Sequence, residues 1–289
     1  MKILLIIPAY NEEKAIGKTI DQIIHYFQKH KEFKGSEIIV VNDGSTDKTY
    51  DEIIKRDVIV VDNGCNKGYG YSLKKGIEKA KHEMIAIIDA DMTYPFSSIK
   101  DLVKKKEEGY DLVVSKRVGI HLQESFFRRL LRKIIIKYIE FITGEKVKDI
   151  NSGFRVFDKS TVTPFFPQLC NTFSFTTTQT LAYIMNSYRV GYVDIKYHER
   201  IGKSKVKFFK DSFIMLRHIL EACVYYNPLK VFGLFSIICF LLSLVCFILS
   251  YSMNLFVFYI LGIVNLILTV LVFGIGLLGV FLKQMNIQK

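Results

Sequence analysis

The chain has 289 residues, which is enough for one medium-sized domain and an appendage. Its 40 Lys and Arg residues outnumber its 28 Asp and Glu residues, and the charge of +12 suits an anionic partner: nucleic acid, a phosphorylated substrate or an acidic membrane surface. The five cysteines show no close pairing motif and the six histidines show no metal-ligand spacing, which argues against a disulfide framework or a zinc site.

The first part of the chain alternates short apolar runs with amphipathic segments. The apolar runs predict strands at residues 3–7, 37–41, 58–61, 84–88 and 111–114. Between the first two runs, residues 15–27 place their isoleucines on one helical face. Repeated strand and helix units predict an α/β domain with a mostly parallel sheet and helices on both sides.

Polar residues follow four of these predicted strands. They are Pro8-Ala9-Tyr10-Asn11-Glu12 after the first, Asn42-Asp43-Gly44-Ser45-Thr46-Asp47 after the second, Asp62-Asn63 and the loop Asn66-Lys67-Gly68-Tyr69-Gly70 after the third, and Asp89-Ala90-Asp91 after the fourth. The ligand crevice of a parallel α/β sheet lies at the carboxyl ends of its strands, so these side chains are expected to meet at one site.

Asp89 and Asp91 are the candidate metal ligands. Carboxylate oxygens suit Mg²⁺ or Mn²⁺, which share their coordination with substrate phosphates. An isolated Asp-x-Asp is equally compatible with a solvated turn, but the neighbouring strand ends favour the metal. The sequence has neither a Walker A loop nor a Gly-x-Gly-x-x-Gly fingerprint, which argues against an ATPase or a nicotinamide enzyme. The pattern predicts a nucleotide with a metal-bound diphosphate.

Two later segments, residues 125–142 and 206–226, mix apolar and basic side chains. This pattern predicts helices that lie in a membrane interface. Packing against the body of the domain is the alternative for both.

The C-terminal region has two long runs without a charged residue, 231–251 and 255–282. Each is long enough to span a bilayer, so they predict a transmembrane hairpin with its turn at residues 252–254. Lys230 precedes the first run and Lys283 follows the second, and the positive-inside rule then places the N-terminal domain in the cytoplasm. The alternative is a pair of buried helices in a soluble core. A membrane is therefore the expected partner, and nucleic acid is not.

The Pro-Ala-Tyr-Asn-Glu, Asn-Asp-Gly-Ser-Thr-Asp and Asp-Ala-Asp elements, in this order, resemble inverting glycosyltransferase family 2 with the nucleotide-sugar fold called GT-A. The resemblance covers residues 2–205 and is greatest to polyprenyl-phosphate hexosyltransferases, such as dolichyl-phosphate mannose or glucose synthases and their undecaprenyl-phosphate relatives. Further matches are Ser115-Lys116-Arg117, the segment from Asp149 to Arg155 and the segment from Arg200 to Lys205. The implied organisation is a catalytic domain at 1–205 that includes the helix at about 125–142, an interfacial helix at 206–228 and a transmembrane hairpin at 229–289.

This resemblance assigns expected roles to single residues. The base and ribose pocket would be lined by Pro8, Tyr10, Glu12, Asp43 and Asp62. The adjacent loop with Lys67 and Gly68 would also contact the substrate. Asp89 and Asp91 would hold Mg²⁺ or Mn²⁺ on the diphosphate, and a loop with Arg200, Ser204 and Lys205 would close over it. The acceptor phosphate would be held by Arg117 and one or more of Arg128, Arg129 and Arg132.

The implied reaction is inverting transfer of a hexose from a UDP- or GDP-sugar to a polyprenyl monophosphate, dolichyl or undecaprenyl. It would take place at the cytoplasmic face of the cell membrane, or of the ER membrane in a eukaryote. A lipid monophosphate is largely ionised near neutral pH, so no catalytic base is required. Two alternatives stay open: a glycosyltransferase with another lipid-linked glycan or a protein as acceptor, and a non-catalytic membrane-anchored protein that binds nucleotide sugars.

Some residues depart from the family pattern or have a structural interpretation. Thr93 stands where mannose-type relatives often carry Gln, and Thr178 and Gln179 stand in the region of a frequent Glu. The chain has no tryptophan, which disfavours a polymerising synthase with a Gln-x-x-Arg-Trp signature. Asp47 and Asn11 have a second interpretation as helix caps, and Arg155 as a salt-bridge partner of Asp149 or Asp158.

Overall fold

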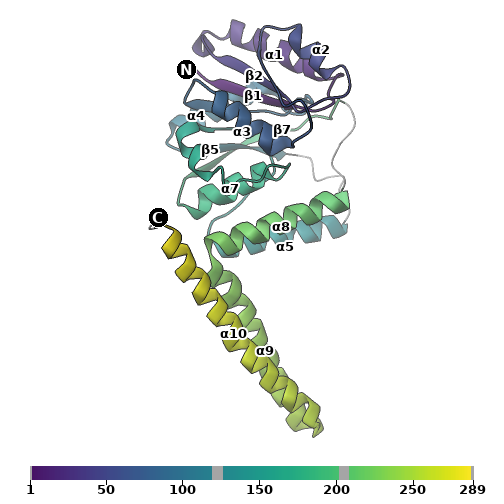
Figure 1. The fold of residues 1–289 in the computed structure, drawn as a ribbon, viewed down its shortest axis with the longest axis vertical. Coiled ribbons are helices and arrows are strands. Elements are labelled where there is room, and N and C mark those ends of the chain that lie inside the picture. Colours follow the sequence, from purple (N-terminus) through teal and green to yellow (C-terminus); the bar gives the residue numbers. More distant parts are fainter. Residues whose placement is uncertain (1, 119–125, 202–207, 288–289) are drawn as a thin grey trace. The chain divides into compact units, whose positions relative to one another are not determined.

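The computed structural model of the protein describes residues 2–118, 126–201 and 208–287 (Figure 1). The chain divides into two compact units, Met1–Ile219 and Leu220–Lys289. The division predicted from the sequence, at residues 205 and 228, stays a prediction.

The first unit is built on a sheet to which the described residues contribute seven strands: β1 (Leu4–Ala9), β2 (Glu37–Asn42), β3 (Ile59–Asp62), β4 (Met84–Ile87), β5 (Leu112–Val118), β6 (Arg155–Asp158) and β7 (Val190–Lys196). Their order across the sheet is β3-β2-β1-β4-β6-β5-β7. Strands β1 to β4 pair in parallel, β5 is parallel to β7, and β6 is antiparallel to both of its neighbours. The predicted α/β class and the mostly parallel sheet are confirmed.

The helices of the chain are α1 (Ile16–Lys29), α2 (Thr49–Ile54), α3 (Tyr69–Lys79), α4 (Ile99–Glu107), α5 (Phe126–Thr143), α6 (Lys159–Val162), α7 (Phe175–Met185), α8 (Phe208–Tyr226), α9 (Pro228–Met253) and α10 (Phe256–Ile287). Helices cover both faces of the sheet, as expected. On one face, Leu5 and Ile7 of β1 join a buried cluster with apolar residues of α1 and α4. On the other, α3 packs so closely that a Cβ at Gly76 would lie 2.7 Å from the Ile6 side chain.

The parallel pairing brings the polar strand ends together. Ala9 at the end of β1 lies opposite Asn42 at the end of β2, and Ile6 lies opposite Ile87 of β4. The residues that follow these strands therefore leave the sheet at the same edge. This edge is where the polar residues were expected to meet.

Helix α5 exposes part of its apolar surface and buries the rest. Leu130, Leu131 and Ile134 are between 43% and 56% exposed, whereas Ile139 and Ile142 are fully buried. The helix thus packs against the domain through its C-terminal half and presents apolar side chains beside basic ones in its N-terminal half. Its place in a membrane interface stays a prediction.

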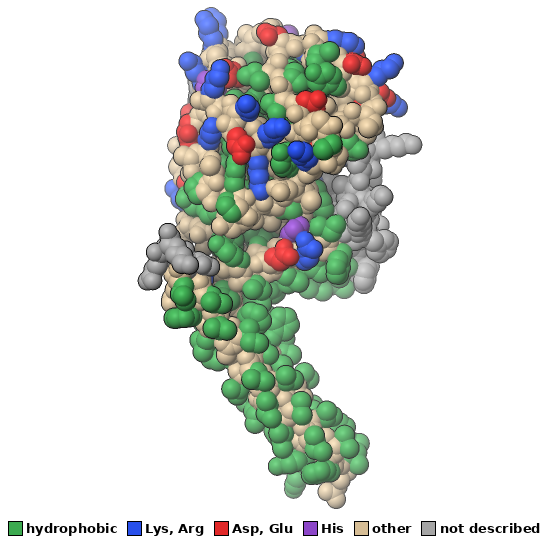
Figure 2. Space-filling model, in the orientation of Figure 1, with side chains coloured by type: hydrophobic (Ala, Val, Ile, Leu, Met, Phe, Trp, Pro, Cys, Tyr) green, Lys and Arg blue, Asp and Glu red, His purple; other side chains and the backbone are tan. Residues whose placement is uncertain are grey.

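The second unit contains the predicted hairpin. Helices α9 and α10 are long and apolar enough to cross a membrane, and hydrophobic side chains cover the face of them seen in Figure 2. Most of their large apolar side chains are exposed, unlike those of a soluble core. Ser243 donates a hydrogen bond to the Gly262 carbonyl at 2.8 Å, and Lys283 donates to the Tyr226 carbonyl at 2.7 Å.

Candidate active site

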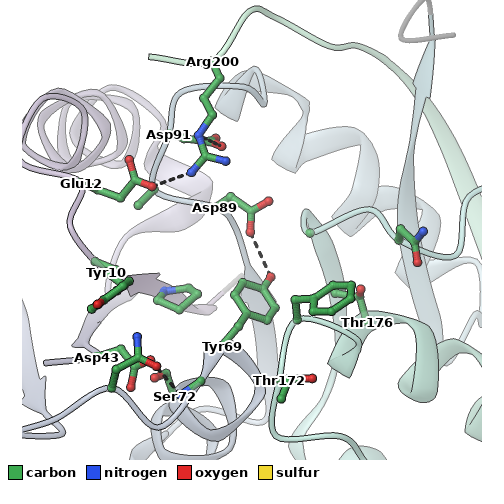
Figure 3. Close-up of a pocket in the computed structure, with 18 residues that line it drawn as sticks. Tyr10, Glu12, Asp43, Tyr69, Ser72, Asp89, Asp91, Thr172, Thr176 and Arg200 are labelled. Carbon is green, nitrogen blue, oxygen red and sulfur yellow. Dashed lines mark hydrogen bonds and ion pairs between the residues drawn. The ribbon is translucent and has the colours of Figure 1, made fainter. Parts of the chain in front are cut away.

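A cavity of about 510 Å³ opens at the carboxyl edge of the sheet (Figure 3). Its lining includes eight residues singled out in the sequence: Pro8, Tyr10, Glu12, Asp43, Gly68, Asp89, Asp91 and Arg200. They come from the ends of β1, β2 and β4, from the loop before α3 and from the segment after β7. The sheet therefore gathers these side chains as its topology predicted, while their individual roles stay predictions.

Asp89 and Asp91 follow β4 directly and are held by hydroxyl groups. Tyr69 donates a hydrogen bond to Asp89 Oδ1 at 3.0 Å, and the Thr93 hydroxyl donates to Asp91 Oδ1 at 2.6 Å. Met92 between them and Thr93 has a φ of 66°, in the left-handed region that disfavours a residue with a side chain. Such strain concentrates at ligand-binding sites, where the surrounding structure maintains it.

The environment of the two aspartates suits a divalent cation. Burial and the nearby Asp91 charge raise the pKa of Asp89 to about 6, although the Tyr69 hydrogen bond opposes the rise. A cation between the two carboxylates would relieve their repulsion, and their oxygen atoms suit Mg²⁺ or Mn²⁺. In the described parts of the chain, no group of three or more His, Cys, Asp or Glu residues could hold a metal. Mg²⁺ is usually bound by one or two carboxylates together with waters and substrate phosphates.

Arg200 joins two strand ends across the cavity. Its Nη2 donates to Glu12 Oε1 at 2.6 Å, and its Nε lies 3.4 Å from Asp91 Oδ2 (Figure 3). Burial alone would lower the pKa of Arg200, but the charges of Asp91 and Glu12 outweigh it and raise that pKa. The backbone is fixed as well, because Ile201 N donates to the Asp91 carbonyl at 3.2 Å. Ser204 and Lys205 lie outside the described residues.

Asp43 is a buried carboxylate that organises a loop. It accepts hydrogen bonds from the backbone N–H groups of Lys67 and Gly68, both at 2.9 Å, and from Asn63 Nδ2 at 2.8 Å. The Asp43 side chain thus fixes the loop before α3 as part of the cavity wall. A direct contact with a nucleotide base was the sequence-based expectation, and it stays a prediction beside this structural role.

Two predicted pocket residues lie outside the cavity lining. Asp62 is exposed at the end of β3 and accepts a hydrogen bond from Asn42 Nδ2 at 2.9 Å. The Lys67 side chain is also exposed, and its Nζ lies 5.1 Å from the centre of the Tyr71 ring. Both residues support the loop geometry around the cavity.

Arg117, Arg129 and Arg132, which were predicted to hold an acceptor phosphate, are not among the described residues that line the cavity. Arg117 forms a bidentate ion pair with Asp149, at 2.8 and 2.9 Å. Burial opposes the charge of Arg117, but the Asp149 hydrogen bonds prevail and raise the Arg117 pKa. Arg129 is exposed and Arg132 partly exposed on α5, and the Arg128 side chain lies outside the described residues.

Arg155 does not make the salt bridge considered from the sequence. It is fully buried, and its guanidinium donates to the Ser152 carbonyl at 3.0 Å, the Thr176 carbonyl at 2.9 Å and Gln179 Oε1 at 3.1 Å. The interpretation as a partner of Asp149 or Asp158 is therefore wrong. Arg155 instead ties the segment around Ser152 to the first turn of α7.

Asp47 acts at the start of α2, one residue before its N-cap Lys48, whereas the interpretation of Asn11 as a helix cap is wrong, because α1 begins after Ala15 and has no side-chain cap. Asp47 accepts a hydrogen bond from Thr49 N at the start of α2, at 3.0 Å. Asn11 accepts one from Thr46 N at 2.7 Å and so links the two polar loops.

Several lining residues were not predicted as part of the site. Thr172, Phe173 and Thr176 come from the segment that enters α7, and Ser72 comes from the first turn of α3. Tyr69 and Asn151 belong to segments that the sequence singled out, but neither was assigned a role. The one available signal was the run of hydroxyl residues from Thr172 to Thr178, which continues into the first turn of α7.

Gly153 makes the closest approach to the acidic pair. A Cβ at this position would overlap the Asp89 carboxyl group. The Gly153 backbone N–H donates to the Tyr94 hydroxyl at 2.8 Å, which holds the segment in place. Asp89 therefore lies between the Tyr69 hydroxyl on one side and the Gly153 backbone on the other.

Solved structures share this fold. Glucosyl-3-phosphoglycerate synthase from Mycobacterium tuberculosis, crystallised with Mn²⁺, UDP and phosphoglyceric acid, superposes with a TM-score of 0.61. The two chains are 19% identical, and the match covers 77% of this chain and 78% of that one. This structural likeness shows a common fold, the GT-A architecture.

Curated relatives are similar over most of their length. The chain is 27% identical to undecaprenyl-phosphate 4-deoxy-4-formamido-L-arabinose transferase of Pectobacterium atrosepticum, over 97% of this chain and 88% of that protein. It is 29% identical to the transferase of the same name from Photorhabdus laumondii, over 80% of this chain and 70% of that one. The model of the family described as "Glycosyl transferase family 2" matches residues 4–163, which contain β1 to β6 and the three aspartates of the cavity. The chain belongs to glycosyl transferase family 2.

Proposed function

We propose that this protein transfers a hexose from a UDP- or GDP-sugar to a polyprenyl monophosphate, with inversion at the anomeric carbon. The observation that carries the proposal is the meeting of Asp89, Asp91 and Arg200 in one cavity at the carboxyl edge of the sheet. Two carboxylates can hold a divalent cation there, and a guanidinium beside them suits the charge of a diphosphate. The relatives named above act on undecaprenyl phosphate, which supports this class of acceptor.

The donor would occupy the cavity along the strand ends. Tyr10 and Asp43, which line the cavity, would bind the base and ribose, and the backbone of the loop at residues 66–70 would form the adjoining wall. Asp89 and Asp91 would hold Mg²⁺ or Mn²⁺, which neutralises the diphosphate when bound. Arg200 would turn from its acidic partners toward the diphosphate and stabilise the charge that develops on the leaving nucleotide.

Each acidic side chain among the described residues of the cavity lining has a hydrogen-bond or ion-pair partner. Asp43 accepts three hydrogen bonds, Asp89 accepts one from Tyr69, and Asp91 and Glu12 both interact with Arg200. A sugar or protein hydroxyl needs a base to take its proton, whereas each of these carboxylates already has another partner in the structure. A phosphate acceptor is already ionised near neutral pH. Its oxygen would attack the anomeric carbon as the bond to the diphosphate breaks.

The membrane segments fit an acceptor with a lipid tail. Helices α9 and α10 would form a hairpin anchor, with Lys230 and Lys283 at its cytoplasmic side and the catalytic unit in the cytoplasm. Exposed apolar side chains of α5 beside Arg129 and Arg132 would bring the site to the bilayer surface. The lipid could then present its phosphate without leaving the membrane.

The test is transfer of label into a lipid product. Purified full-length protein is incubated with Mn²⁺, undecaprenyl or dolichyl phosphate and a panel of labelled UDP- and GDP-sugars, and label extracted into organic solvent is counted. Label from one donor, lost on treatment with EDTA and restored by Mn²⁺, is the expected result. Binding of a nucleotide sugar without transfer to either lipid would refute the acceptor assignment.

A further inference from the structure

A strap of residues, 169–173, crosses the cavity wall and is held from two sides. Thr172 and Phe173 of this strap line the cavity. From one side, Gly70 N and Tyr71 N at the start of α3 donate to the carbonyls of Thr172 and Asn171, at 3.2 and 2.9 Å. The approach is close, since a Cβ at Gly68 would lie 2.6 Å from the Asn171 carbonyl oxygen.

Helix α8 holds the same strap from the other side. Cys170 Sγ lies 3.2 Å from His218 Nε2, so that a thiol–imidazole hydrogen bond joins the strap to α8. The sulfur is buried, and it also lies 2.9 Å from the Thr172 hydroxyl. The sulfur atom of Cys170 thus links His218 to Thr172, a residue of the cavity lining.

A second contact from α8 reaches another wall of the cavity. Asn151 Nδ2 donates to Met215 Sδ at 3.4 Å, and Asn151 lines the cavity. Met215, His218 and the fully buried Ile219 lie on one face of the helix, whereas Phe213 on the other face is 72% exposed. Helix α8 is thus amphipathic, and its inner face holds two separate walls of the site.

We propose that His218 is a positioning residue, which acts through Cys170 to hold the strap 169–173 against the loop before α3. Met215 supports the second wall in the same way, by a weaker bond, because thioether sulfur is a poor acceptor. The geometry of the cavity then depends on a helix that continues in the sequence into the α9–α10 hairpin. The kinetic part of this inference rests on the proposed function, while its structural part does not.

Hydrogen exchange of the full-length protein tests the structural part without any substrate. In His218→Ala, amide exchange in peptides that cover 66–74 and 169–176 is expected to become about fivefold faster, as for loss of one hydrogen bond. His218→Gln, whose amide can still bond the thiol, is expected to restore slow exchange. His25→Ala serves as the matched control, because His25 is an exposed histidine on helix α1.

The pattern of exchange distinguishes local loosening of the strap from a general loss of stability. Unchanged exchange in both peptides of His218→Ala would overturn the inference, and so would faster exchange spread evenly over the whole first unit. In the lipid transfer assay, kcat/KM is expected to fall about fivefold in His218→Ala and to recover in His218→Gln. Local faster exchange without transfer activity in any variant, wild type included, would support the strap and refute the proposed acceptor instead.

Discussion

The two sides of the cavity use aspartate in different ways. On the β2 side, Asp43 is bonded to two backbone N–H groups and a buried amide, so its carboxylate is part of the framework. On the β4 side, Asp89 accepts from the Tyr69 hydroxyl, and Asp91 accepts from the hydroxyl and the backbone N–H of Thr93 and lies 3.4 Å from Arg200 Nε, so most of these partners are side chains. Aspartate at this edge of the sheet thus fixes the cavity wall on the β2 side, whereas on the β4 side it can exchange its side-chain partners for a ligand. The variants below test this difference.

The largest effect is expected from Asp91→Asn. If the β4 side binds the metal and diphosphate, turnover should fall on the order of a thousandfold, because the amide cannot supply the charge that holds the cation. Thermal stability should change little, since the remaining oxygen can still accept from Thr93. Steady-state rates and a thermal melt of both proteins check this. Activity within a few-fold of wild type would show that the acidic pair is not the metal site.

Asp149 lies outside the described cavity lining and, like Asp43, has a structural role, because it forms an ion pair with Arg117. Arg117→Ala should cost about 3 kcal/mol of stability, because the largely buried Asp149 is left without its partner. The double variant Arg117→Ala with Asp149→Ala should recover much of that loss, as measured by denaturant unfolding. The KM for the acceptor separates the two roles of Arg117. If this KM returns to the wild-type value in the double variant, Arg117 only pairs with Asp149. If it stays raised, Arg117 contacts the acceptor phosphate.

Asp43→Asn should affect the framework rather than the chemistry. The Asn amide would face an N–H group that now bonds a carboxylate oxygen, at a cost of about 2 kcal/mol. The first unit should unfold at a lower temperature, and UDP or GDP should bind more weakly, while the Mn²⁺ dependence of the remaining activity stays as in wild type. A change in the Mn²⁺ requirement alone would contradict the contrast between the two sides.

The smallest expected effect is that of Tyr69→Phe. Loss of the hydroxyl leaves Asp89 free to rotate, and the affinity for Mn²⁺ in the presence of nucleotide should fall about tenfold, as is usual for partners of metal ligands. Titration followed by the EPR signal of free Mn²⁺ measures this without catalysis. Tyr71→Phe on the same helix is the control and should bind Mn²⁺ as wild type does.

The sequence predicted the five strands that carry an apolar run and missed the last two. Strands β1 to β5 begin or end within a few residues of the predicted runs, and this holds even for β3, which lies partly exposed at the edge of the sheet. Strand β6 has only four residues, and it lies antiparallel between β4 and β5. Strand β7 alternates exposed and buried residues, so no apolar run marks it.

The site residues that could be predicted from the sequence are the charged ones that follow a predicted strand. Asp89, Asp91 and Asp43 follow apolar runs, and the sheet topology alone places them at one edge. Thr172 and Phe173 reach the cavity through contacts made by Gly68 and Gly70, which depend on packing between segments a hundred residues apart. The pairing of Arg117 with Asp149 likewise depends on how the segment before β6 folds back, which no local pattern encodes.

The contact between Gly153 and Asp89 has a consequence for how this protein can change over evolutionary time. The φ angle of Gly153 is not in the positive region, so its backbone would accept any residue, yet the carboxyl group of Asp89 fills the space where a side chain would begin. A replacement at this position is therefore expected to displace the Asp89 carboxyl group from its place beside Tyr69. Alanine or serine should be better tolerated together with a shorter residue at 89, so that changes at the two positions are expected to occur together.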